Sequence, residues 1–338
     1  MKYYSFILIA ILILSCSSES SEWEKILEQN SEESYLEFLN KYPDGQFAPA
    51  AKDSLVSIDF NNAILANTQK AYEDFLQKYP DSKFSSVLLD SIENKEYESA
   101  RKENTIEAYS NYIKNYPNGK YIVYANKEID EITLKKGYFI DKRDNRKYKV
   151  VKIGKQVWMA ENLAYLPKVC QPEDNCGYWV YDYKGNSVIE AKATNNYKIF
   201  GVLYDYETAI NSCPAGWHLP TDDEWKALEM YLGMSKNELN NPSYIRGTDE
   251  GGKLKAKKTW LGPAGAYNAT GESGFSALSG GYLDRYKFEG IYKSTVFLTS
   301  TKDDTGCVYL RALNHGDKLI QRTCIDAKTA CSVRCIKD

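Results

Sequence analysis

Apolar residues recur in the first third of the chain with the spacing of α-helices, and the whole pattern repeats every 37 residues. Aromatic positions align three times without insertion or deletion: Trp23, Phe60 and Tyr97; Tyr35, Tyr72 and Tyr109; and Phe38, Phe75 and Tyr112. We therefore divide this region into three units, over residues 23–59, 60–96 and 97–133. Because one unit cannot bury its apolar face alone, we expect the three to stack around a continuous core.

Each unit is predicted to form two helices. The first begins beside an Asn-Ser or Asn-Thr pair, at residues 30–31, 67–68 and 104–105, because Asn, Ser and Thr are favoured N-caps. A Tyr-Pro pair ends this helix, since proline cannot continue it, and a longer second helix follows. The repeat length and the YPDSKF turn at residues 79–84 resemble tetratricopeptide-like repeats of envelope lipoproteins, which usually have about 34 residues. The resemblance implies a rigid spacer or, alternatively, a groove that binds a protein partner.

From residue 137 onward, short alternating runs and glycine turns replace the helical pattern. Residues 148–158 predict two strands joined by a tight turn. One helix is predicted over 204–212, and a second starts at Thr221, which forms a capping box with Glu224. A Gly-rich irregular segment is predicted over 241–290, and strands follow at roughly 294–300, 306–313, 318–324 and 331–336. The fold class is therefore α+β, with an all-α repeat array first.

The first 15 residues have the features of a signal peptide, with an apolar run at residues 6–14 that is too short to cross a bilayer. The run leads to Ser15-Cys16, which resembles the lipobox of bacterial lipoproteins. The resemblance implies that Cys16 is lipidated and anchors the protein to a membrane, with residues 16–22 as lipidated Cys and polar tether. Position 17 lacks the Asp of an inner-membrane retention signal, so we expect an outer-membrane lipoprotein that faces the periplasm or the cell surface. An ordinary secreted protein cut near Ser15 is the alternative.

The net charge and the number of histidines disfavour several classes of function. The chain has 43 Lys and Arg against 46 Asp and Glu, a net charge of −3, which disfavours nucleic acid as a partner. Its two His residues disfavour a His-rich metal site, and no nucleophile, base and orienting residue can be placed together. We therefore predict no catalytic residue, no metal and no cofactor, and we expect that the protein is not an enzyme.

Four sequence blocks, at residues 137–165, 201–229, 271–282 and 331–338, resemble the Fibrobacter succinogenes major paralogous domain in family order. The resemblance covers residues 137–338 and implies a C-type-lectin-like fold with no general enzymatic activity. In the lectin-like architecture a Cys that closes the first helix pairs with one in the last strand, which implies a disulfide between Cys213 and Cys335. Calcium-dependent sugar binding is not expected, because residues 297–301 lack the Trp-Asn-Asp of such lectins.

Seven of the eight cysteines follow residue 169, in a chain expected to leave the cytosol, so disulfides are expected. Cys307 and Cys324 lie symmetrically about a predicted turn at 314–317 and can form a cross-strand disulfide. Cys170 and Cys176 can close a small loop, and Cys331 is left over. A Cys324–Cys331 disulfide with Cys307 free is the competing arrangement.

Aromatic residues are the strongest functional signal, since the chain has 28 Tyr, and Tyr and Trp rings suit sugar rings and protein surfaces. The candidate ligand-binding residues are Tyr178, Trp179, Tyr181, Trp260, Tyr282 and Tyr286. We predict non-catalytic binding of a protein or glycan ligand by the C-terminal domain. The alternatives are an envelope scaffold whose repeats bind a protein partner, and an undetected hydrolase.

Overall fold

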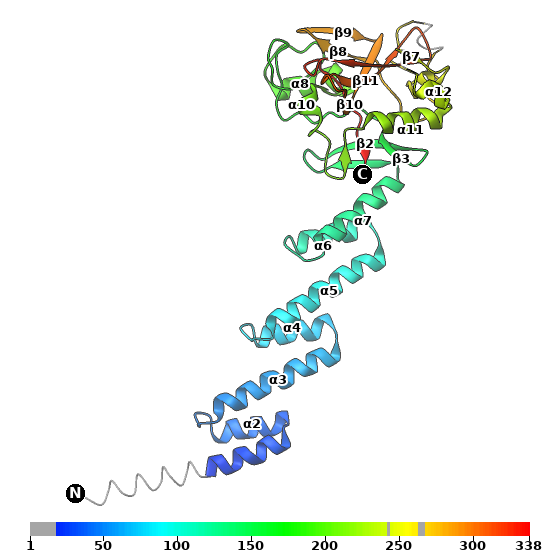
Figure 1. Ribbon diagram of the computed structural model, residues 1–338. Coiled ribbons are helices and arrows are strands. Elements are labelled where there is room, and N and C mark those ends of the chain that lie inside the picture. The colour runs from blue at the N-terminus through cyan, green and yellow to red at the C-terminus, as the bar shows by residue number, and fades with distance from the viewer. Residues whose placement is uncertain (1–17, 242–243, 263–267) are drawn as a thin grey trace, which may run out of the picture. The chain divides into compact units, whose positions relative to one another are not determined.

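The computed structural model describes residues 18–241, 244–262 and 268–338 (Figure 1). The chain forms two compact units, one ending at Ile129 and the other running from Asp130 to Asp338. The predicted signal peptide and Cys16 lie outside the described residues. Within the described ranges, no helix has both the length and the apolar content needed to span a bilayer.

The N-terminal unit is built from short and long helices in alternation. A helix over residues 18–29 is followed by α2 (Glu32–Lys41), α3 (Ala48–Ala66), α4 (Gln69–Lys78), α5 (Ser85–Glu103), α6 (Ile106–Asn115) and α7 (Ile122–Lys135), of which the residues from Asp130 onward belong to the second unit. Equivalent helices start 37 residues apart, as the repeat predicts. The predicted unit boundaries after residues 59 and 96 fall inside α3 and α5, because each long helix continues into the next unit.

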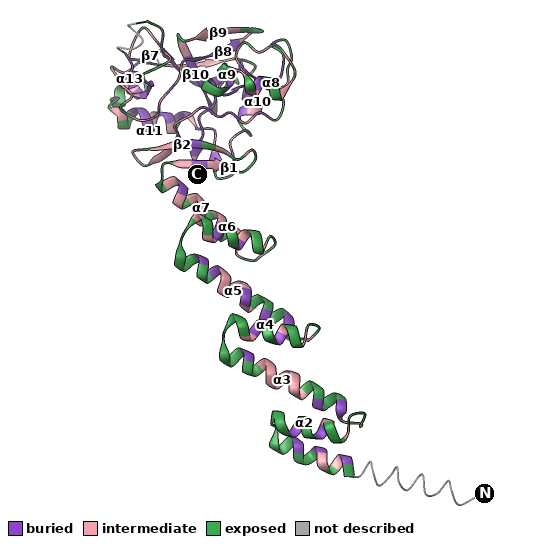
Figure 2. Ribbon diagram, turned by 180° about the vertical axis from the view of Figure 1, so that it is seen from behind, coloured by how far each residue is buried: buried purple, intermediate pink, exposed green. Residues whose placement is uncertain are grey.

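Aromatic stacking explains why the repeat landmarks recur. Near the end of each long helix, a landmark ring stacks on an aromatic ring at the start of the next long helix. The three stacked pairs are Trp23 with Phe47 at 5.4 Å between centroids, Phe60 with Phe84 at 4.2 Å, and Tyr97 with Tyr121 at 4.3 Å. The buried residues of the short helices lie beside these pairs, and the other faces of the short helices are exposed (Figure 2). Consecutive long helices are therefore held together by one repeated ring contact.

The Asn-Ser and Asn-Thr pairs both end one helix and begin the next. Asn67 and Asn104 are the C-caps of α3 and α5 in the left-handed conformation, which Asn tolerates better than most residues. The following Thr68 and Thr105 hydroxyls then accept a hydrogen bond from the backbone amide three residues on, at 3.2 and 3.1 Å. The predicted helix starts are thus confirmed at these caps.

The C-terminal unit contains two β-sheets. The five-stranded sheet has the order β1 (Tyr138–Asp141), β2 (Arg146–Ile153), β3 (Gln156–Met159), β14 (Ile336–Lys337), β6 (Trp217–His218). The nine-stranded sheet has the order β4 (Tyr178–Trp179), β5 (Leu203–Tyr204), β13 (Cys331–Ser332), β10 (Ser294–Lys302), β11 (Val308–Asn314), β12 (Ile320–Ile325), β7 (Ile245–Arg246). In addition, β8 (Gly280–Asp284) pairs with β10 and with β9 (Lys287–Ile291).

The hairpin predicted over residues 148–158 is confirmed as β2 and β3, with Ile153 opposite Gln156. Two other predictions for this unit need correction. The single strand predicted over 331–336 is instead split, because the chain crosses from one sheet to the other between β13 and β14. The segment predicted to be irregular, 241–290, contains β7, β8, β9 and a short helix.

The helices of this unit are α8 (Val188–Ala193), α9 (Asn195–Phe200), α10 (Tyr206–Ala209), α11 (Asp222–Leu232), α12 (Lys236–Leu239) and α13 (Glu250–Leu254). The predicted helix over 204–212 is only the single turn of α10, and α8 and α9 were not predicted. The Thr221 capping box is confirmed, with the Glu224 amide donating to Thr221 Oγ1 at 3.1 Å and the Thr221 amide donating to Glu224 Oε2 at 2.8 Å. In α13, a Cβ on Gly251 would lie 2.1 Å from the Leu319 carbonyl oxygen, so glycine is needed there for close packing.

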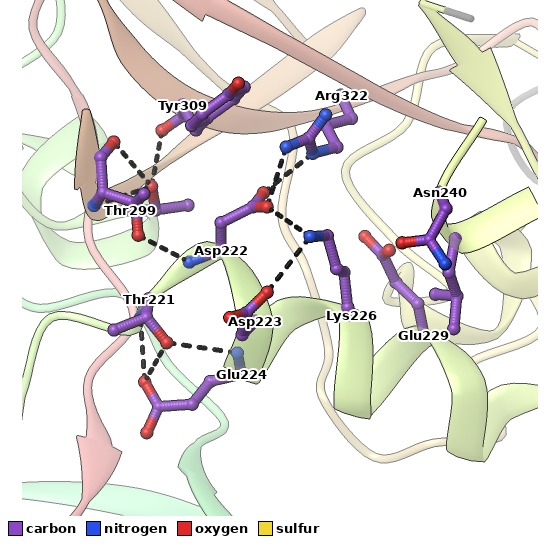
Figure 3. Close-up of polar contacts among 12 residues, drawn as sticks. Thr221, Asp222, Asp223, Glu224, Lys226, Glu229, Asn240, Thr299, Tyr309 and Arg322 are labelled. Atoms are coloured by element: carbon purple, nitrogen blue, oxygen red, sulfur yellow. Dashed lines mark hydrogen bonds and ion pairs between the residues drawn. The ribbon is translucent and has the colours of Figure 1, made fainter. Parts of the chain in front are cut away.

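A buried ionic network joins α11 to one face of the β10–β12 sheet. Arg311 of β11 is fully buried and binds Glu229 and Asp222 of α11, the latter at 2.8 Å. Arg246 binds Glu229 at 2.8 Å. Arg322 binds Asp222 at 2.8 Å, and Lys226 also contacts this carboxylate (Figure 3). Burial alone would raise the pKa of Asp222, but Arg322 and Arg311 hold it well below its usual value. The network fixes α11 beneath the sheet whose opposite face carries the candidate site.

Candidate ligand-binding pocket

A pocket of about 800 Å³ lies on the face of β10–β12 opposite the ionic network. Alternate side chains of the three strands form its floor: Ser294 and Val296; Leu310, Ala312 and Asn314; and Gln321, Thr323 and Ile325. The register aligns them, since Val296 and Gln321 both lie opposite Ala312 on either side of β11. Successive strand residues face opposite sides of a sheet, so Arg311 faces the ionic network while its neighbours face the pocket.

One wall of the pocket is the tip of the β8–β9 hairpin. Asp284 pairs with Lys287, which leaves Arg285 and Tyr286 as a two-residue turn with φ of 46° and 69°. Such turns favour Asn and Gly, because bulky residues at positive φ are strained by on the order of 1–3 kcal/mol each. The hairpin is fixed to the following loop, where Thr329 Oγ1 donates to Asp284 at 3.1 Å. The strained turn places the Tyr286 ring at the rim, with 66% of the residue exposed.

A second wall, which packs beside the hairpin, is the loop closed by the Cys170–Cys176 disulfide; it contributes Pro172, Asp174 and Asn175. Trp179 supports this loop from β4, since its indole Nε1 donates to the Gln171 carbonyl at 2.9 Å. Only 3% of Trp179 is exposed, so the ring contributes an edge to the pocket and packs mainly in the core. The disulfide and the indole hydrogen bond together hold the wall in place.

Charged groups at the pocket are mixed, with a small acidic excess. The carboxylates are Asp174, Asp284 and Asp326, and the cations are Arg285 and Lys328. The hydroxyl of Tyr282 donates to Glu289 at 3.2 Å, and burial followed by the Glu289 charge raises the pKa of Tyr282. Tyr282 is therefore a neutral hydrogen-bonding group at physiological pH.

The predicted ligand-binding residues do not all lie together. Trp179, Tyr282 and Tyr286 line the pocket. Tyr178 is half-buried with its ring edge-on to Tyr204 at 5.7 Å, and Tyr181 packs against Phe288 at 5.1 Å.

Trp260 is part of the core and does not line this pocket. It is 7% exposed, and Lys255 Nζ lies 5.0 Å from its ring centroid. Burial lowers the pKa of Lys255 to about 8. We therefore place Trp260 outside the candidate site, because a ligand would have to displace core residues to reach its ring.

Polar residues of the pocket floor were missed from the sequence. Asn314, Gln321 and Thr323 line the pocket, and the Tyr244 hydroxyl at its edge donates to Gln321 Oε1 at 2.7 Å. The available signal was the alternation in residues 320–325, where two polar residues share the face of a predicted strand. This alternation does not show which face of the sheet the polar residues occupy until the register with β11 is known.

The cysteines pair as Cys213–Cys335, Cys307–Cys324 and Cys170–Cys176, with Cα–Cα distances of 5.9, 5.4 and 5.8 Å. The competing Cys324–Cys331 disulfide is not formed, and Cys331 has a buried thiol whose pKa is raised by burial. Cys324 lies opposite Tyr309 and not opposite Cys307, so the predicted symmetric hairpin is wrong in register.

One group of potential metal ligands, Asp303, Cys307 and Cys324, lies with its ligand atoms within 4.8 Å of one another in the described part of the chain. The two sulfur atoms are joined in a disulfide, so they cannot serve as thiolate ligands.

Comparison with known proteins agrees with this architecture at the level of one family. The model of the Fibrobacter succinogenes major domain matches residues 151–337, which is more than half of the chain. No curated protein and no solved structure matches the chain. The matched region begins within β2 and includes every wall of the pocket. The chain therefore belongs to the Fibrobacter succinogenes major domain family.

Proposed function

We propose that the protein is a non-catalytic envelope lipoprotein whose C-terminal domain binds a protein or glycan ligand in the pocket over β10–β12. The pocket carries this proposal, because it combines exposed aromatic surface at Tyr286 with polar side chains on a rigid sheet. A C-type-lectin-like classification is part of the proposal. It is supported by the order of helices, a long segment with little regular structure and a final sheet, and by the Cys213–Cys335 disulfide.

The N-terminal part of the proposal is a lipid anchor followed by a tetratricopeptide-like spacer. The apolar run at residues 6–14 before Cys16 supports the anchor and the outer-membrane location. The three-fold recurrence of a short and a long helix supports the repeat classification. In this arrangement the repeats hold the binding domain away from the membrane.

The test of the binding role is a variant that fills the pocket. Thr323→Trp places an indole on the half-buried floor at β12. Met230→Trp adds the same ring to an exposed position of α11 outside the pocket. The purified full chain and both variants are applied to glycan and peptide arrays. We expect Thr323→Trp to lose binding at an unchanged melting temperature, while Met230→Trp binds like the parent. Equal binding by all three proteins would refute a role for the pocket.

A second candidate function is partner binding by the helical repeats. Leu65 and Val123 support it, because these apolar residues are 82% and 76% exposed on α3 and α7. The full chain carrying both Leu65→Ser and Val123→Ser would then lose a protein partner that the parent captures. The pocket variant Thr323→Trp would retain this partner. Retention by both variants would refute this alternative.

A further inference from the structure

The hydrogen-bonding groups of the pocket surround an apolar centre. Val296, Leu310 and Ala312 form the middle of the floor. Within the described ranges, the side chains of Asn314 and Thr323 at the edge of this floor make no hydrogen bond to the protein. A pyranose ring has the matching chemistry, with apolar C–H faces and hydroxyl groups around its edge.

Aromatic surface is available at the rim of this floor. The strained turn at Arg285 and Tyr286 holds one tyrosine ring at the rim, and Tyr282 lies on the same wall. Strained backbone at positive φ is found at ligand clamps, where the surrounding structure keeps it in place. A ring that is 66% exposed on such a turn is suited to stacking on a sugar face.

Charge disfavours an anionic ligand. Three carboxylates face two cations at the pocket, so a uronic acid or phosphate group would meet like charge on desolvation. The same carboxylates are strong acceptors for the hydroxyl groups of an uncharged ligand. The pocket of about 800 Å³ is also in the upper part of the range of about 300–1,000 Å³ for small-molecule sites, which favours several linked rings.

An extended peptide lacks its usual mode of recognition on this floor. Peptides commonly bind a sheet by adding a strand to a free edge. The central strand of the floor, β11, is paired on both sides, with β10 and with β12. Its backbone groups are therefore already used, so the middle of the floor offers only side chains to a ligand.

We propose that the pocket binds an uncharged oligosaccharide, with one sugar ring stacked on Tyr286 and hydroxyl groups of different rings bound by Asn314 and Thr323. This inference rests on the proposed binding function and names the ligand class of the same site. Asp284 and Asp326 are the charged acceptors at its edge. The ligand lies across the three strands, beside the hairpin tip and the disulfide-closed loop.

The test uses isothermal titration of the full chain with cellohexaose, maltohexaose, mannohexaose and xylohexaose. An oligogalacturonate and an array of unrelated peptides are the charged and peptide probes. The variants are Tyr286→Ala and Thr323→Val, and the control is Tyr231→Ala, a tyrosine of matched 65% exposure on α11 outside the pocket. We expect at least one neutral oligomer to bind, Tyr286→Ala to weaken it about tenfold, Thr323→Val to weaken it severalfold, and the control to have no effect.

The failures of the two proposals can be told apart. If only the oligogalacturonate or a peptide binds, and Tyr286→Ala abolishes that binding, the ligand class is wrong and the binding function stands. If no probe binds, or if both pocket variants bind a probe as the parent does, the pocket is not a binding site and both proposals are refuted.

Discussion

The carboxylate of Glu229 in the C-terminal unit is paired with two buried arginines, so we expect the unit to be sensitive to its loss. It is fully buried and accepts hydrogen bonds from Arg311 Nε and from Arg246 Nη2, the second at 2.8 Å. Glu229→Gln keeps the shape of the side chain but removes its charge. Arg246, whose carboxylate partner among the described residues is Glu229, would then lose its ion pair. Arg311 would keep only the carboxylate of Asp222, which also serves Arg322 and Lys226.

Removing one partner from a buried ion pair costs about 3–5 kcal/mol, because the remaining charge stays desolvated without compensation. For a unit of this size, about 1 kcal/mol corresponds to roughly 2–4 °C, so the expected fall in melting temperature is about 6–20 °C. Five of the six tryptophans lie in the C-terminal unit, so tryptophan fluorescence during thermal unfolding reports mainly on it.

The control for Glu229→Gln is Asp74→Asn in the exposed Lys70–Asp74 pair of α4, whose atoms lie 3.2 Å apart. Exposed helix pairs contribute about 0.3–0.5 kcal/mol, so this change should hardly move either transition. If Glu229→Gln also lowered stability by less than about 1 kcal/mol, the network would be better hydrated than its burial implies, and the argument from desolvation would be refuted.

Three further predictions concern single chemical groups. Replacing both Cys213 and Cys335 by Ser opens a loop of 122 residues, and chain entropy alone predicts a loss of about 5 kcal/mol; unchanged urea unfolding would contradict this. His218 binds Glu224 and Asp338 through its two ring nitrogens, at 2.9 and 2.6 Å. Burial opposes protonation, but these carboxylates outweigh it and raise the pKa of His218. The stability that these ion pairs contribute is therefore complete below the unfolded pKa of about 6.5 and is lost as pH rises through the higher folded pKa. The melting temperatures of His218→Gln and the parent should differ at pH 6 and converge at pH 8.5. A difference that stays constant with pH would refute the ion pairs. Finally, Cys16→Ser should move the protein from the membrane pellet to the soluble fraction of fractionated cells, and the variant remaining in the pellet would exclude lipidation as the anchor.

Much of the fold could be predicted because it depends on neighbours along the chain. The helix ends at Asn67-Thr68 and Asn104-Thr105 depend on hydrogen bonds that span three residues. The capping box of Thr221 is equally local, and the turn between β2 and β3 joins strands adjacent in sequence. The same reasoning failed where alternatives differ only in long-range pairing, as for residues 331–336, which the fold divides between two sheets.

The candidate site could be predicted only in part. Tyr282 and Tyr286 were predicted as ligand-binding residues because they are aromatic. Residue type alone could not distinguish them from Trp260, which is a core residue. The assumption of a symmetric turn between Cys307 and Cys324 also gave a register that differs from the observed one. Register decides which face each side chain occupies, so Thr323 could not be assigned to the pocket without it.

By itself, the sequence determined the helical repeats, the helix caps, the α+β class and the family of the C-terminal domain. Each of these depends on spacing within a few residues or on a pattern that repeats along the chain. Only the tertiary structure decided the pocket, because its lining runs from Pro172 to Thr329 and comes together through sheet register, a strained turn and a disulfide-closed loop. Local hydrogen bonds select an element, whereas the burial of distant side chains against one another selects which of its faces meets the solvent.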